Sequence, residues 1–390
     1  MADATATPAM VTDKGLDNVI IGDSTKSFID GTAGVLEYVG IDIDDLARNS
    51  TFEECCYLLW YDRLPTTAEL QSFEAEIRSH YQLSDEIKQM IMATPKFASP
   101  MHVVRTMVSA LGCEDPDCND QSMEAEERKA LRVLAKTPAI IAGFDRHRRG
   151  ESLVDPDPSL NIATNFLMML NGDMPGEQTA RALDVCLILH ADHGINASTF
   201  ATMVAIGTQS DMYSAITAAI GTLRGPLHGG ANERVMNMLQ QIGTIDNVES
   251  FIRSRLENKE KVPGFGHRVY KAYDPRAKYL KTFAETIAEE TGNHDLYTMS
   301  STIEQIMEEA VGSRGIHPNV DFFSATSYFS MGLAIDLFTP VFALARNAGW
   351  AAHAFERIED NRLIRPRCNY TGPHQAPYVP IEDRASTASG

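Results

Sequence analysis

The sequence predicts a mainly α-helical fold, and three observations support this prediction. Apolar residues recur at helical spacing along most of the 390-residue chain, and capping residues precede many of these runs. No alternating βαβ pattern and no internal repeat is visible in the sequence. Hydrophobic residues make up 44% of the chain, enough for a substantial core. At this length we expect two or three domains, or one large domain with a smaller one built into it.

In the first half of the chain, the pattern predicts one hairpin followed by helices. Residues 18–31, NVIIGDSTKSFIDG, contain short apolar runs broken by Gly-Asp and Asp-Gly, which predicts a small hairpin. A helix is predicted to start after Thr51 as its cap and to stop at Pro65. Residues 114–128, EDPDCNDQSMEAEER, are acidic and predict a solvated loop that runs into a helix.

Helices in the second half of the chain are predicted from their end signals. Apolar spacing over Val235, Met238, Leu239 and Ile242 predicts a helix that Gly243 ends. The other signals are a cap and first-turn pair at Asp274 and Pro275, a capping box of Ser301 and Glu304 in a helix ending at Gly312, and a further cap and first-turn pair at Thr339 and Pro340.

The charge balance excludes several classes of partner. With 53 acidic and 34 basic residues the net charge is −19, which argues against nucleic acid and anionic membranes as partners. The N-terminus lacks a basic and apolar leader, and no run of about 18 apolar residues appears, so we expect a cytoplasmic protein without a membrane span. An acidic surface is also typical of proteins adapted to a high-salt cytoplasm, although an ordinary acidic enzyme would share it.

The six cysteines form no CxxC pair and no zinc-ligand spacing. This pattern fits reduced thiols in a cytosolic protein better than a disulfide framework.

His228 stands in an unusual setting, GPLHGGAN, at or just before a predicted helix start. Free backbone N–H groups and the positive end of the helix dipole disfavour an imidazolium at such a position. A neutral histidine there can donate a hydrogen bond to a substrate oxygen. The alternative is a tight turn with an incidental exposed histidine.

Further polar residues recur at turns in the second half of the chain. Several arginines converging on one site suggest a di- or tricarboxylate or a phosphate, because a guanidinium pairs with such anions bidentately. Arg276 is predicted in the first turn of a helix, where the dipole would favour an anion beside it. Two histidines framed by glycines suggest two groups that polarise carbonyls, and an aspartate near a helix start could act as a base.

Two other kinds of site are disfavoured by the motifs. His190 and His193 in HADH could share a helix face, but no third metal ligand follows in a known spacing, so we expect no metal. We expect one of these histidines to pack structurally and the other to meet substrate. The segment VPGFGH lacks the Walker spacing, which excludes a P-loop.

Five blocks in order, HADHGINAST, GPLHGGAN, VPGFGHRVYKAYDPR, NVDFFSA and RPRCNYTG, closely resemble those of citrate synthases of the short form. The resemblance covers nearly the whole chain. It implies a helical homodimer with a large domain from residues 1–224 and 328–390, a small domain at 225–327, and an active site in the cleft between them. It also implies no cofactor, with oxaloacetate and acetyl-CoA as substrates condensed to citrate at the entry of the tricarboxylic acid cycle.

The resemblance also implies roles for single residues. Asp321 matches the base, His228 the donor to the thioester oxygen, and His267 the residue that polarises the oxaloacetate carbonyl. The oxaloacetate contacts would be His193, Arg276, Arg346 and, from the other subunit, Arg365, chosen over Arg367. The CoA contacts would be Val262, Gly264, Phe265, Gly266 and Lys271.

Other functions remain open at this stage. The nearest alternative is a 2-methylcitrate synthase that uses propionyl-CoA, since one methylene changes binding by only about 1–3 kcal/mol. More distant alternatives are a metal-dependent hydrolase that uses the His and Asp set, and a non-catalytic helical binding protein that keeps the fold.

Overall fold

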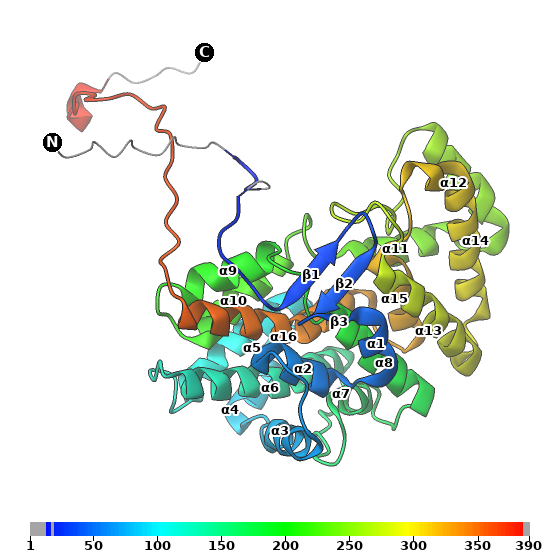
Figure 1. The fold of residues 1–390 in the computed structure, drawn as a ribbon, viewed down its shortest axis with the longest axis horizontal. Helices are drawn as coiled ribbons and strands as arrows, with labels where there is room; N and C mark the ends of the chain where they lie inside the picture. Colours follow the sequence, from blue (N-terminus) through cyan, green and yellow to red (C-terminus); the bar gives the residue numbers. More distant parts are fainter. Residues whose placement is uncertain (1–12, 17–18, 385–390) are drawn as a thin grey trace.

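The computed structural model describes residues 13–16 and 19–384, and the described part is mainly helical, as predicted (Figure 1). The strands are β1 (Ser27–Asp30), β2 (Val35–Tyr38) and β3 (Ile41–Asp42). The α-helices are α1 (Ile43–Asn49), α2 (Phe52–Tyr61), α3 (Thr67–Ser79), α4 (Asp85–Ala93), α5 (Pro100–Glu114), α6 (Met123–Arg149), α7 (Ile162–Asn171), α8 (Glu177–His190), α9 (Ala197–Ile206), α10 (Met212–Leu223), α11 (Ala231–Ile242), α12 (Val248–Glu257), α13 (Pro275–Thr291), α14 (His294–Val311), α15 (Val320–Ser330) and α16 (Phe338–Glu359). Short 3-10 helices are η1 (Ile245–Asn247), η2 (Gly312–Arg314), η3 (Ile335–Leu337) and η4 (Ile381–Asp383).

The hairpin lies further along the chain than predicted. The three strands form one antiparallel sheet in the order β1-β2-β3, with Ile29 opposite Leu36. Only β1 falls within residues 18–31, and Asn18 lies outside the described residues. The turn forms after Asp30 because its carboxylate accepts hydrogen bonds from the backbone N–H groups of residues 32 and 33, at 2.8 and 2.9 Å. The Gly-Asp pair at residues 22–23 therefore precedes the sheet.

Several predicted helix ends are confirmed by local hydrogen bonds. Thr51 caps α2, and α2 ends at Tyr61, earlier than the predicted stop, because Asp62 adopts a left-handed conformation. Asp274 caps α13 through its side chain, with Pro275 at the first helical position. Gly243 follows the last residue of α11. Residues 115–122 form the predicted loop before α6.

Two predicted helix starts are wrong. Helix α14 begins at His294, so Ser301 lies inside the helix and caps nothing. Its hydroxyl is buried and has no hydrogen-bond partner among the described residues. Helix α16 begins at Phe338 after the 3-10 turn η3, which places Thr339 within the first turn instead of at the cap. In both cases the helix begins before the Ser or Thr that was predicted as its cap, although these residue types often cap helices.

Helix α16 forms the centre of the core. It contacts α2, α6, α8, α9 and α10, and its residues from Phe338 to Phe355 are almost all buried. Figure 1 shows it crossing behind the small sheet, with the C-terminal segment leaving its end. Residues 338–355 of the helix are surrounded by protein, so their polar side chains face partners inside the core.

Helices α11 to α15 gather on one side of the molecule (Figure 1). Within this group α15 packs on α11 and α13, while α12 packs on α14. Contacts of α13 with α8 and α1, and of α11 with α16, join the group to the rest. Among the described helices none is both long and apolar enough to span a membrane.

Candidate active site

His228 lies in the turn between α10 and α11, as its glycine-framed setting suggested. Its Nε2 accepts a hydrogen bond from the backbone N–H of Ser198 at 3.2 Å. Because Nε2 is an acceptor, the proton of the neutral ring is on Nδ1. Burial, assisted by the Arg346 charge, lowers the pKa of His228 to about 4. The ring is therefore neutral at pH 7, with Nδ1–H left as a donor.

Ser198 connects this histidine to the core helix. Its hydroxyl lies 2.8 Å from His228 Nε2 and accepts a hydrogen bond from Trp350 Nε1 at 3.1 Å. Ser198 is in the first turn of α9, whose cap is Asn196. Helix α16 thus fixes the start of α9, and that helix start fixes the tautomer of His228.

His267 has the opposite tautomer. Its Nδ1 accepts hydrogen bonds from the backbone N–H groups of Val269, at 3.0 Å, and Tyr270, at 3.2 Å. The proton of the neutral ring is therefore on Nε2. Burial, with the nearby Arg276 charge, lowers the pKa of His267 to about 4. Two neutral imidazoles, each with one N–H donor left for a ligand, are therefore present.

His193 lies beside His267, with ring centroids 5.4 Å apart. Its Nε2 is 3.2 Å from the hydroxyl of Tyr270. Burial and the charges of Arg276 and Arg346 hold the pKa of His193 well below its usual value. His190 ends α8 and His193 lies beyond that helix, so the two do not share a helix face. His190 is fully buried, with Nδ1 2.7 Å from the Cys186 carbonyl, and is the structural histidine of the pair.

Two buried arginines come together at this place but differ in their partners. Arg276 makes a two-pronged ion pair with Asp274, at 2.9 and 2.8 Å, so a side chain already supplies the anion that its helix position required. Arg346 lies on α16, where its Nε donates to the His190 carbonyl at 2.7 Å. No ion pair of the described residues involves Arg346, and burial lowers its pKa to about 10. Its charge is therefore available to an anionic ligand.

Asp321 lies in the first turn of α15, two residues after the cap Asn319. Burial raises the pKa of its carboxyl to about 6, against the opposing charge of Arg276. Within the described ranges, no hydrogen bond reaches this carboxylate. Such a carboxylate is a stronger base than a solvated one, yet it is still ionised at pH 7.

The charges of Arg276 and Arg346 link these groups electrostatically. The Arg346 charge acts on the pKa of His193, His228 and Asp321. The Arg276 charge acts on the pKa of His193, His267 and Asp321. Residues from four separate sequence blocks therefore lie within electrostatic reach of Arg276, Arg346 or both.

The loop 262–266 is tied to the segment that leads into Asp321. Gly266 N donates to the His317 carbonyl and Asn319 N donates to the Gly264 carbonyl, both at 2.9 Å. The Phe265 ring lies 4.7 Å from Phe322, and Val262 is buried. These contacts fix the position of the loop, and of any ligand bound to it, relative to the carboxylate of Asp321.

Two predicted site residues are not placed in this group by the single chain. The side chain of Lys271 is exposed, while its backbone N–H donates to Gly31 at the sheet turn, at 2.8 Å. Arg365 is exposed on the segment that leaves α16 and runs away from the body (Figure 1).

Several supporting residues were not predicted from the sequence. Tyr270, Ser198 and Trp350 contact the histidines directly or through one hydrogen bond. Asp274 was assigned only a capping role, although it also pairs with Arg276. A single Trp or Tyr within an apolar run looks like an ordinary core residue, so the sequence does not indicate that its side chain supports a histidine.

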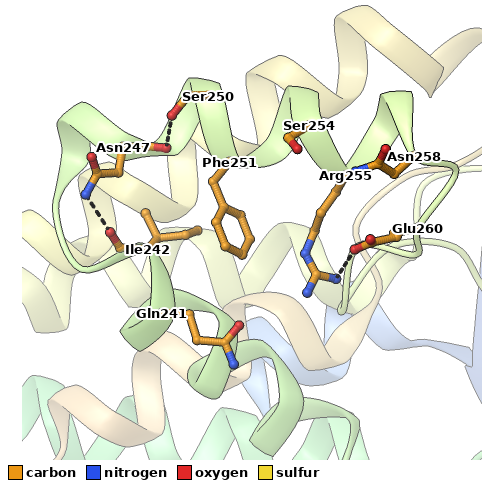
Figure 2. Close-up of a pocket in the computed structure, with 9 residues that line it drawn as sticks. All are labelled: Gln241, Ile242, Asn247, Ser250, Phe251, Ser254, Arg255, Asn258 and Glu260. Atoms are coloured by element: carbon orange, nitrogen blue, oxygen red, sulfur yellow. Dashed lines mark hydrogen bonds and ion pairs between the residues drawn. The ribbon is translucent and has the colours of Figure 1, made fainter.

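A separate open pocket of about 440 Å³ lies between α11 and α12. Figure 2 shows its mixed lining of polar and apolar residues, in which Arg255 lies 3.9 Å from Glu260 and near the Phe251 ring. None of the predicted site residues lines this pocket. The histidines and Asp321 described above therefore lie outside this pocket, near Arg276 and Arg346.

The fold and the site together define a class of protein. Neutral histidines polarise carbonyl oxygens, a desolvated carboxylate removes protons, and an unpaired buried guanidinium binds a carboxylate. These groups in a helical protein point to an enzyme that activates carbon acids beside a carboxylate-bearing substrate.

Comparison with known proteins identifies the family. Residues 15–367 match the family described as "Citrate synthase, C-terminal domain". The chain is 47% identical to a citrate synthase of Haloferax volcanii, over 95% of this chain and 98% of that protein. It is 39% identical to 2-methylcitrate synthase 1 of Corynebacterium glutamicum, over 95% of this chain and 98% of that protein.

A solved structure agrees with this result. Citrate synthase of Thermoplasma acidophilum in a ternary complex with carboxymethyl coenzyme A and oxaloacetate has a TM-score of 0.90 and 36% identity, covering 96% of this chain and all of that one. The chain belongs to the citrate synthase family.

Proposed function

We propose that the chain condenses acetyl-CoA with oxaloacetate and hydrolyses the resulting citryl-CoA to citrate and CoA. The observation that carries this proposal is the pair of neutral histidines with opposite tautomers, His228 and His267, in one site with the desolvated carboxylate of Asp321. Each imidazole has one N–H donor free, and the reaction has two carbonyl oxygens to polarise.

Oxaloacetate is the dianion of the reaction. The unpaired guanidinium of Arg346 would take one carboxylate, with Arg276 and His193 contacting the rest of the molecule. Such binding places the ketone carbon next to His267, because the His193 and His267 rings are adjacent.

Enolisation of acetyl-CoA is the difficult step. Asp321 removes a proton from the methyl group, and His228 Nδ1–H donates to the thioester oxygen as negative charge develops there. A positioned base contributes about 10²–10⁴-fold, and a preorganised donor to the oxyanion is worth about 3–4 kcal/mol. Both groups are needed because a thioester methyl is a far weaker acid than a carboxyl.

Condensation follows at the ketone. The enol carbon forms a new bond to the carbonyl carbon of oxaloacetate, and the ketone π electrons become an alkoxide that His267 Nε2–H stabilises and protonates. Water then attacks the thioester carbonyl of citryl-CoA, and the C–S bond breaks to give citrate and CoA.

The acyl carrier would be held by the loop of Val262, Gly264, Phe265 and Gly266, with Lys271 reaching a CoA phosphate. Support comes from the backbone ties between this loop and the start of α15. We further propose the division into a large domain, 1–224 and 328–390, and a small domain, 225–327. Closure of one on the other would exclude water from the reacting thioester.

Arg365 would act across the interface of a homodimer. Its support is the extended segment 361–384, which exposes apolar side chains including Leu363, Tyr370, Tyr378 and Ile381. Such a segment gains burial by packing on a second copy.

Free-thiol release with acetyl-CoA and with propionyl-CoA, each with and without oxaloacetate, tests the function in molar KCl. Oxaloacetate-dependent release that favours acetyl-CoA is expected. A preference for propionyl-CoA would move the assignment to a 2-methylcitrate synthase, and no release from folded protein with either thioester would overturn both.

A further inference from the structure

A buried ionic group lies behind the turn that carries His193, and the mechanism above does not use it. Asp192, directly before His193, has no exposed surface, and His353 on α16 is 1% exposed. Glu356, one turn further along α16, completes the group. Burying charges is costly unless they are paired and hydrogen-bonded, so this arrangement requires an explanation.

The contacts of Asp192 brace both sides of His193. Its carboxylate accepts hydrogen bonds from the backbone N–H of Gly194, at 3.1 Å, and from the Ser27 hydroxyl. Its own backbone N–H donates to the Tyr38 hydroxyl at 3.1 Å, and that hydroxyl donates to the Asp192 carbonyl at 3.0 Å. The chain is therefore held immediately before and immediately after His193.

His353 supplies the charge that keeps this carboxylate in place. Its Nε2 lies 3.3 Å from Asp192, and its Nδ1 lies 3.3 Å from Glu356. Burial lowers the pKa of His353, but the two carboxylates outweigh burial and raise it to about 9. The imidazolium is therefore present at neutral pH, between two anions.

The approach of α16 to this turn is close. Gly349 N donates to the Ala191 carbonyl at 3.0 Å, and a Cβ at residue 349 would lie 2.3 Å from the Asp192 carboxylate. The helix can bring His353 against Asp192 only because this glycine has no side chain.

We propose that His353 is a positioning residue for substrate binding: through Asp192 it fixes the turn that presents His193 to oxaloacetate. The inference rests on the proposed function, because oxaloacetate is the ligand that His193 would contact. It goes further by assigning a task to a charged side chain that does not itself reach the substrate.

The test is His353→Gln, with isothermal titration of oxaloacetate and separate KM values for both substrates. Gln keeps a donor but has no charge. Groups that orient the ligands of a metal change its affinity about 10–100-fold. By analogy we expect the Kd of oxaloacetate to rise about tenfold. At saturating oxaloacetate, kcat and the KM of acetyl-CoA should stay within about twofold, because His228 and Asp321 are held by other contacts.

The matched control is His147→Gln on α6, another buried histidine, whose Nε2 lies 3.0 Å from the Thr94 carbonyl away from the site. It should alter stability without altering the Kd of oxaloacetate. Asp192→Asn, alone and combined with His353→Gln, completes a double-mutant cycle in which the two effects should be strongly non-additive.

An unchanged oxaloacetate Kd in folded His353→Gln, or equal losses for both substrates, would overturn the inference. If that variant does not fold, Ser27→Ala decides, since it removes one hydrogen bond to the same carboxylate and should raise the oxaloacetate Kd severalfold. The wild-type assay separates the two proposals: absence of oxaloacetate-dependent thiol release would overturn the function, whereas an active wild type with unaltered variants would overturn only the positioning role.

Discussion

At the scale of single residues, hydrogen bonds to one ring nitrogen decide what the other can do. Backbone N–H groups occupy Nε2 of His228 and Nδ1 of His267, so the fold itself selects each tautomer. Burial then keeps both rings neutral at pH 7. Asp321 is affected by the same burial in the opposite sense, since its charged form is the one disfavoured.

Asp321→Asn should lower kcat about 10²–10⁴-fold, because it removes a positioned base. In the unmodified protein kcat/KM should fall as the pH drops below about 6, where the raised pKa of Asp321 leaves the carboxyl protonated. Steady-state rates between pH 5 and 8 check this. A pH-independent rate across that interval would contradict the role of Asp321 as base.

The same substitution should raise the thermal midpoint at pH 7. A carboxyl whose folded pKa is raised destabilises the fold where it is charged, above about pH 6, and this cost vanishes below the ordinary pKa. Scanning calorimetry at pH 7 should therefore show Asp321→Asn more stable than wild type. Equal midpoints there would argue that the carboxyl is better solvated than its position indicates.

At the scale of elements, the position of loop 262–266 depends on its close contact with helices α15 and α11. Gly264 has φ +82°, and a Cβ there would lie 2.7 Å from the Phe322 ring and 2.8 Å from Val235. The loop can thus rest on α15 and α11 only with a glycine at this position. Because the loop is hydrogen-bonded to residues 317–319, a displacement of the loop would also shift the segment that precedes Asp321.

Gly264→Ala should raise the KM of acetyl-CoA and lower the thermal midpoint, since overpacking costs typically about 1–3 kcal/mol. Gly292→Ala is the matched control, because Gly292 has φ +77° but no heavy atom of the described residues lies within 4 Å of an added Cβ. Kinetics and calorimetry on both variants separate the clash from backbone strain. Identical effects on KM in the two variants would contradict the proposed CoA loop.

Local signals in the sequence predicted the helices better than the site. Caps such as Asp274 with Pro275 act within one turn, so the sequence displays them directly. Ser301 shows the limit of such signals, because the same residue pattern occurs inside α14. His193, His228, His267 and Asp321, named by resemblance, lie within electrostatic reach of Arg276 or Arg346, and their roles stay a prediction. Partners such as Tyr38 of Asp192, 154 residues apart, leave no periodic trace in the sequence.

At the scale of the whole molecule, charge and assembly are the properties to test. Arg365 lies on a segment that leaves the body, so its proposed role needs a second chain. The net charge of −19 implies strong repulsion among the acidic side chains. Salt screens this repulsion over a Debye length of about 10 Å at 0.1 M ionic strength, and the length shortens at higher concentration.

Mixing Arg365→Ala with Asp321→Ala subunits should restore part of the activity if Arg365 acts in trans. A mixed dimer would contain one site with both residues intact. Activity is measured after subunit exchange, and native mass spectrometry verifies that heterodimers form. Heterodimers without recovered activity would place Arg365 in its own subunit's site.

Lowering the KCl concentration should destabilise the protein. The excess of acidic side chains repels itself more strongly as screening weakens, so the thermal midpoint should fall between molar and low-millimolar KCl. Calorimetry over that range checks the high-salt hypothesis. A midpoint independent of KCl would indicate an ordinary acidic enzyme.

Along α16, Arg346, Trp350, His353 and Glu356 follow one another at intervals of three or four residues and so share one face. One inserted or deleted residue upstream of them would turn this whole face by about 100°. The position of residues along this single helix therefore sets the orientation of Arg346, for which we propose substrate binding, together with that of Trp350, His353 and Glu356. The loop of residues 262–266 is hydrogen-bonded to the segment before α15, so such a rotation of α16 would not by itself reorient that loop.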